Sequence, residues 1–130
     1  MNRAIEIHES TLGSLTTDRG LLVLHFSSAY VHESEGIPGV ESGTCWMQEA
    51  YLKIGNAVVV GFFSELPGDL VGGHIRIGDV LSDNMIPFPL DHLGQAELRR
   101  EKYGEAVSIT GTSAKLELVG EATSVEEFRR

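Results

Sequence analysis

Short runs of β-forming residues, separated by clusters of glycine, proline, asparagine or aspartate, recur along the whole chain. This spacing is typical of antiparallel sandwiches and small barrels, in which a turn follows each short strand. No helical pattern alternates with the strands, so a parallel sheet with crossover helices is not expected. The sequence predicts one all-β domain over residues 1–130, an antiparallel β-sandwich or partly closed β-barrel of about eight to ten short strands.

The run at 46–54 alternates apolar and polar side chains, which is the pattern of a half-buried strand. Gly55-Asn56 follows this run and precedes a second apolar run at 57–63. Glycine readily adopts the positive φ that the first position of a type II′ turn requires. We therefore expect the chain to reverse direction at Gly55-Asn56 and to form a hairpin.

A second hairpin is expected near the end of the chain. The apolar residues of 107–109 can pair with those of 116–118 across Gly111-Thr112-Ser113. A last strand at 123–128 would then complete the sheet. Both hairpin predictions depend on glycine acting as a turn residue.

The segment 91–103 carries signals for both kinds of secondary structure. Asp91 is a candidate N-cap and is followed by good helix formers, so one short helix can form there. A strand from Gln95 to Arg100, leading into a turn at Tyr103-Gly104, is the other interpretation. We favour the strand, because the neighbouring segments on both sides are strands.

Two runs, 20–26 and 57–63, are apolar on both faces. A strand of this kind is either covered on both sides of the sheet or contacts another subunit. Between Val71 and Ile77, by contrast, the apolar residues share one face, which leaves His74 and Arg76 on the other. In the one-sided run 71–77, the apolar face is therefore expected to meet the core and the face with His74 and Arg76 to meet solvent.

The formal net charge of −9 excludes some classes of partner. Lys53 is the only lysine or arginine between residues 20 and 75, and the later cluster of Arg99, Arg100 and Lys102 is diluted by glutamates. Binding to nucleic acid or to an anionic membrane depends on concentrated positive charge. We therefore expect neither partner.

The compartment is expected to be the cytoplasm. No apolar stretch approaches the roughly 20 residues of a membrane helix, and the first fifteen residues contain no apolar block typical of a secretory signal. Cys45 is the only cysteine, so an internal disulfide and a cysteine-rich zinc site are both excluded.

The chain carries none of the sequence motifs of a nucleophile elbow, a phosphate-binding loop, a dinucleotide-binding loop or a zinc protease. Cys45 has no basic neighbour in the sequence to activate its thiol. No two of the five histidines stand at i, i+2 or i, i+4, the spacings that place two ligands on one face of a strand or helix. We assign no catalytic residue, no metal site and no cofactor.

The segment 30–46 is the most informative candidate for binding, because it reads as a long loop on a β scaffold. Tyr30 and His32 share strand parity and are expected to line the mouth of a pocket together with Trp46. The full set of candidate binding residues also includes the acidic loop residue and two further histidines: Tyr30, His32, Glu33, Trp46, His25 and His74.

These features favour a small, non-catalytic binding or assembly domain that associates with itself or with another protein. The first alternative is a β-barrel that binds a small molecule in a pocket lined by the candidate residues. The second is a cupin-like metal-dependent enzyme that uses scattered histidines, although the HxH pair typical of cupins is absent. The pocket alternative requires that His25 and His74 converge.

Overall fold

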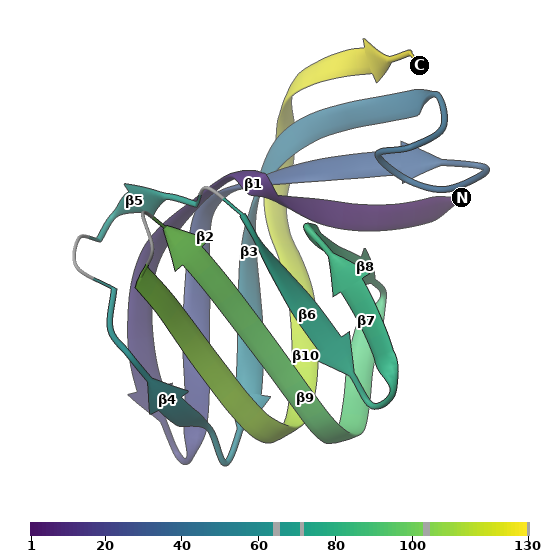
Figure 1. Cartoon of the computed structure of the whole chain (residues 1–130). Helices are drawn as coiled ribbons and strands as arrows, with labels where there is room; N and C mark the ends of the chain where they lie inside the picture. Colours follow the sequence, from purple (N-terminus) through teal and green to yellow (C-terminus); the bar gives the residue numbers. More distant parts are fainter. Residues whose placement is uncertain (64–65, 71, 103–104, 130) are drawn as a thin grey trace.

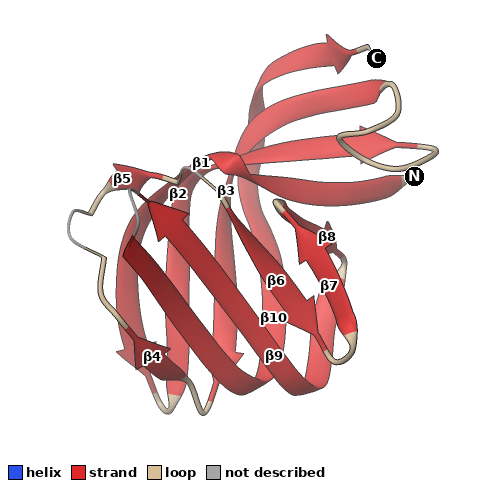
Figure 2. Ribbon diagram, viewed as in Figure 1, coloured by secondary structure: helices blue, strands red, loops and turns tan. Residues whose placement is uncertain are grey.

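The computed structural model describes residues 1–63, 66–70, 72–102 and 105–129. Within these residues the chain forms ten strands and no helix, which confirms the all-β prediction (Figure 2). The strands are β1 (Asn2–Asp18), β2 (Leu21–Ser34), β3 (Gly43–Gly55), β4 (Val58–Val60), β5 (Gly68–Asp69), β6 (Gly73–Ile77), β7 (Val80–Asp83), β8 (Met85–Phe88), β9 (Leu90–Lys102) and β10 (Glu105–Phe128).

All strands belong to one antiparallel sheet with the order β5-β1-β2-β3-β10-β9-β6-β7, while β4 pairs with β10 and β8 pairs with β1. The sheet curls into a half-barrel (Figure 1). This agrees with the predicted partly closed barrel. The described residues contain no helix of the length and apolarity needed to cross a membrane.

Four long strands, β1, β2, β3 and β10, bend where the pairing between them shifts. The shifts fall at one level of the sheet: between Glu6 and Thr11, between Phe26 and Ala29, and between Val119 and Thr123. β-Bulges of this kind turn strands away from their course. Beyond the bend, the strands form a projection that carries both termini (Figure 1). We call it the arm: residues 2–6, 29–34, 43–48, 85–88 and 123–128.

The hairpin predicted at Gly55-Asn56 is wrong. Gly55 pairs with Ser113, and Val58 pairs with Thr110, so β4 continues past β3 along the same neighbour without reversing. Asn56 has a φ of 51°, and Asn56 and Ala57 are the two residues that separate β3 from β4. Asparagine tolerates this left-handed conformation, and here the conformation makes a break in a strand rather than a turn.

The hairpin predicted across Gly111-Thr112-Ser113 is also wrong, because β10 runs through these residues. A Cβ atom on Gly111 would lie 2.4 Å from Ile54 Cγ2 and 2.6 Å from the carbonyl oxygen of Gly55. Gly111 therefore allows a close approach between β10 and the end of β3. Gly111 is thus a position of close backbone packing and does not mark a reversal of the chain.

The ambiguous segment is a strand, as favoured: β9 includes Gln95 to Arg100. The turn predicted at Tyr103-Gly104 and the residue Val71 lie outside the described residues. The concave side of the half-barrel is filled by the apolar core, to which Leu24, Phe26 and Ile75 contribute buried side chains.

Outward-facing positions alternate with these core positions. Arg76 is exposed and His74 is half-buried, as the parity of 71–77 predicted. In β2, Leu21 and Val23 form the outer face of the two-sided apolar run and are half-buried. On the inner face of the run at 20–26, Leu24 and Phe26 are buried and Leu22 is half-buried, while the outer face is partly covered.

Candidate functional site

Tyr30 and His32 lie on one face of the arm, as their parity predicted. The imidazole Nε2 of His32 lies 3.0 Å from Glu6 Oε1, and the rings of Tyr30 and His32 meet edge to face at 4.8 Å. The Tyr30 hydroxyl lies 3.1 Å from Cys45 Sγ. This cluster of Glu6, Tyr30, His32 and Cys45 contains the residue types from which acid–base or nucleophilic sites are built.

His32 is buried because small residues flank it. Its cross-strand neighbours are Ala4 and Cys45, and the ring of Phe128 packs edge to face against it at 5.0 Å. The Glu6 carboxylate accepts a hydrogen bond from Nε2. Nδ1 has no hydrogen-bond partner among the described residues, and it is enclosed and out of reach of solvent.

The Tyr30 phenol is held in its neutral form. Its hydrogen bond with Cys45 raises the pKa of Tyr30 well above its ordinary value of 10.0, and burial and the nearby Cys45, Glu126 and Glu6 act in the same direction. The Cys45 thiol is buried, whereas reactive cysteines are at least partly exposed. The cluster is therefore a hydrogen-bonded packing unit rather than an accessible catalytic centre.

Trp46 and Glu33 lie on the opposite face of the arm. Trp46 pairs with Val31, and its indole Nε1 donates to Gln48 Oε1 at 2.9 Å. The Arg3 guanidinium stacks over the Trp46 ring at 5.5 Å and forms a 2.6 Å ion pair with Glu33. Tyr30, His32 and Trp46 consequently do not line one pocket mouth. The predicted long loop is shorter than expected, since β2 and β3 extend into it and leave only 35–42.

His25 and His74 do not converge. His25 lies on β2, bonded to Glu49 Oε2 at 2.6 Å and stacked on Tyr51 at 4.8 Å. His74 lies on β6, 3.7 Å from Glu97 Oε1. Three strands, β3, β10 and β9, separate the two in the sheet. The histidine-lined pocket therefore does not form.

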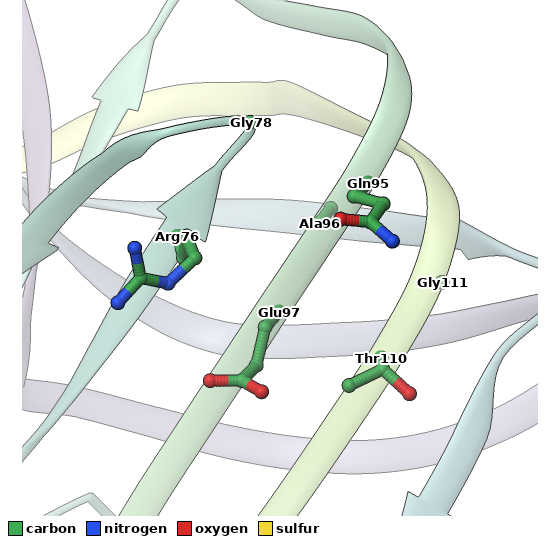
Figure 3. A pocket seen from close by; sticks show the side chains of 7 residues that line it. All are labelled: Arg76, Gly78, Gln95, Ala96, Glu97, Thr110 and Gly111. Carbon is green, nitrogen blue, oxygen red and sulfur yellow. The ribbon is translucent and has the colours of Figure 1, made fainter.

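A groove crosses the outer surface of β6, β9 and β10 (Figure 3). Arg76, Glu97 and Thr110 stand in one cross-strand row, and Figure 3 shows their side chains on neighbouring strands. Gly78 and Gly111 contribute only backbone atoms to its lining. Among the described residues, none that line the groove carries a buried polar atom without a hydrogen-bond partner.

The edge strand β4 exposes an unbroken apolar surface. Val58, Val59 and Val60 are 43–66% exposed, and Phe62 just beyond them is 75% exposed. β4 pairs with β10 through all three valines. No charged residue occurs between Ile54 and Phe63. In the two-sided apolar run 57–63, Val58 to Phe62 stay exposed, whereas Ala57 and Phe63 pack against the core.

Arg100 was overlooked as a site residue, because the sequence places it in a surface cluster with Arg99 and Lys102. It is 8% exposed and lines an apolar cavity in the concave side of the half-barrel. A signal was present: Ala96, Leu98 and Arg100 alternate along β9, and all three are buried. An arginine in phase with two core residues is an inward-facing arginine.

The chain matches no protein-family model, no curated protein and no solved structure. Within the described residues, no three histidine, cysteine, aspartate or glutamate side chains are grouped so that they could hold a metal ion. The arm, the β4 edge and the concave cavity are the candidate sites that the geometry offers.

Proposed function

We propose that this chain is a non-catalytic assembly domain that associates with a second copy of itself through the edge of β4. The observation that carries the proposal is the exposure of three consecutive valines on a strand at the border of the sheet. Exposed apolar edge strands readily pair with another strand, and proteins that remain monomeric usually protect them with charge or proline. Val58–Val60 has neither protection.

The strand is suited to pairing with its own copy. In an antiparallel pair related by a two-fold axis at Val59, each Val59 faces its equivalent, and each Val58 faces a Val60. Cross-strand pairs of β-branched residues stabilise a sheet. Phe62, which follows the strand, extends the same apolar surface.

Charge favours this edge over the rest of the surface. Each copy carries a formal net charge of −9, so two copies repel one another through most orientations. The stretch from Ile54 to Phe63 is free of charge and allows the closest approach of two copies. Since three residues make a short edge, we expect association in the micromolar range.

The test compares Val59→Lys with Leu93→Lys. Both add one positive charge in place of an exposed apolar residue, because Leu93 is 89% exposed on β9. Two lysines opposite each other at the axis would repel. In native mass spectrometry and light scattering across a concentration series, wild type and Leu93→Lys should form dimers. Val59→Lys should stay monomeric, with dimerisation at least about tenfold weaker.

A wild-type protein that stays monomeric throughout the series would overturn the proposal. So would a Val59→Lys variant that dimerises as well as the wild type.

A further inference from the structure

Arg100 is a buried cation without a counter-ion in the described part of the chain. Its Nε atom is enclosed and has no hydrogen-bond partner there. None of the ion pairs among the described residues includes Arg100. Its contact is the ring of Phe63, whose centroid lies 4.5 Å from the guanidinium carbon.

The cavity beside Arg100 is otherwise apolar. Its enclosed space measures about 10 Å³ and is lined by Arg100 and by side chains of the core: Ile7, Leu12, Leu24, Phe26, Phe63, Leu70, Ile86 and Leu98. Pockets for drug-sized molecules measure about 300–1,000 Å³, so no such ligand fits while the lining side chains keep these positions. A space of about 10 Å³ holds about one water molecule, so a longer ligand must displace a side chain.

A buried charge is costly unless it is paired and hydrogen-bonded. The face of Phe63 offsets part of this cost through a cation–π contact, but it accepts none of the guanidinium hydrogen bonds in the way that an oxygen does. The guanidinium fork matches a carboxylate, with two parallel N–H donors for two oxygens. The missing partner is therefore best supplied by a carboxylate attached to an apolar group.

We propose that the concave side of the half-barrel binds a small monocarboxylic acid with an unbranched apolar chain. The carboxylate accepts hydrogen bonds from Arg100, and the chain lies among Phe26, Leu24 and Leu98. Phe63 follows β4 and packs against the core from outside the main sheet. Its ring is the side chain that the ligand displaces, since it covers both the guanidinium and the cavity.

The proposal is tested by calorimetric titration of the full chain with octanoate, acetate and octanol, each below its aggregation concentration. Octanoate carries both the carboxylate and the chain, whereas each of the others carries one of them. Octanoate should bind at least about tenfold more tightly than either. Equal binding of octanoate and octanol, or no binding of octanoate, would overturn the proposal.

Two variants locate the site. Arg100→Met keeps an apolar side chain of similar length and should weaken octanoate binding at least about tenfold, to the level of octanol. Arg99→Met removes the same charge at the preceding, outward-facing position and should leave octanoate binding unchanged. If Arg100→Met binds octanoate as wild type does, the site is not at Arg100. If Arg100→Met does not fold, the three ligands on the wild-type protein decide.

Discussion

The arm and the half-barrel both bury polar side chains, but they differ in how far these side chains are hydrogen-bonded. At the base of the arm, Ser10 Oγ donates to the carbonyl oxygen of Glu6 at 2.6 Å and accepts from the Tyr30 amide at 3.0 Å. His32 is bonded to Glu6, and Tyr30 is bonded to Cys45. In the half-barrel, the Arg100 guanidinium faces apolar side chains and one aromatic ring.

The polar side chains of the arm are bonded to one another, whereas Arg100 has no acidic partner in the part of the chain that the structure describes. In the arm, His32 Nδ1 has no hydrogen-bond partner among the described residues, and in the half-barrel the same holds for Arg100 Nε. The other ring nitrogen of His32 is bonded to the Glu6 carboxylate, whereas the always-charged guanidinium of Arg100 has no acidic partner within the described ranges. The bonded network lies at the level where the long strands bend, so it stabilises the junction between the arm and the half-barrel. The ligand site proposed above therefore lies in the half-barrel and not in the arm.

Among the variants that test this comparison, His32→Ala is expected to change the free energy of unfolding most. Replacing His32 with alanine removes a buried ring and leaves Glu6 without its partner, so the free energy of unfolding should fall by about 2–4 kcal/mol. Urea denaturation measures this change. The control is His8→Ala, since His8 is exposed, and it should stay within about 0.5 kcal/mol of the wild type. A similar small effect of both variants would mean that the arm network is not structural.

A smaller effect, which sharpens the comparison, is expected from the Tyr30–Cys45 bond at high pH. The folded state raises the pKa of Tyr30 above the ordinary value of 10.0. Below pH 10 the phenol is protonated in both states, and its contribution to stability is fully present. As the pH rises above 10, the unfolded chain loses the proton while the folded chain keeps it, so stability falls.

The measurement is urea denaturation of wild type and Tyr30→Phe between pH 8 and about pH 11. The loss of stability above pH 10 should be smaller in Tyr30→Phe than in the wild type. Tyr51→Phe, which leaves the bond to Cys45 intact, should behave as the wild type does. Parallel pH curves for wild type and Tyr30→Phe would exclude a stabilising role for the neutral phenol.

The fold class could be predicted from the sequence, but the lengths of the strands could not. Periodicity identifies the runs around Leu24 and Ile75, because each run has a face buried in the core. Glycine has two uses that the sequence does not separate: a turn, and a close approach between backbones. Gly111 and Gly55 allow a close approach between backbones in a sheet with a sharp bend. The chain therefore continues in the same direction at both positions where the sequence predicted a hairpin.

The candidate site was predictable only within single strands. Tyr30 and His32 are two residues apart, so their shared face follows from strand geometry alone. The position of Trp46 depends on the register between β2 and β3, and that register is set by a bulge between Phe26 and Ala29. Arg100 shares the phase of the core residues of β9, but its two basic neighbours in the sequence suggested a surface cluster.

The free energy of unfolding of Arg100→Met, measured in urea without added ligand, tests the central contrast between the two regions most directly. If Arg100 is an unpaired buried cation, an apolar side chain of similar size should raise the free energy of unfolding by about 1 kcal/mol or more, in contrast to the loss at His32. A decrease would mean that Arg100 stabilises the folded state, as the polar side chains of the arm are expected to do.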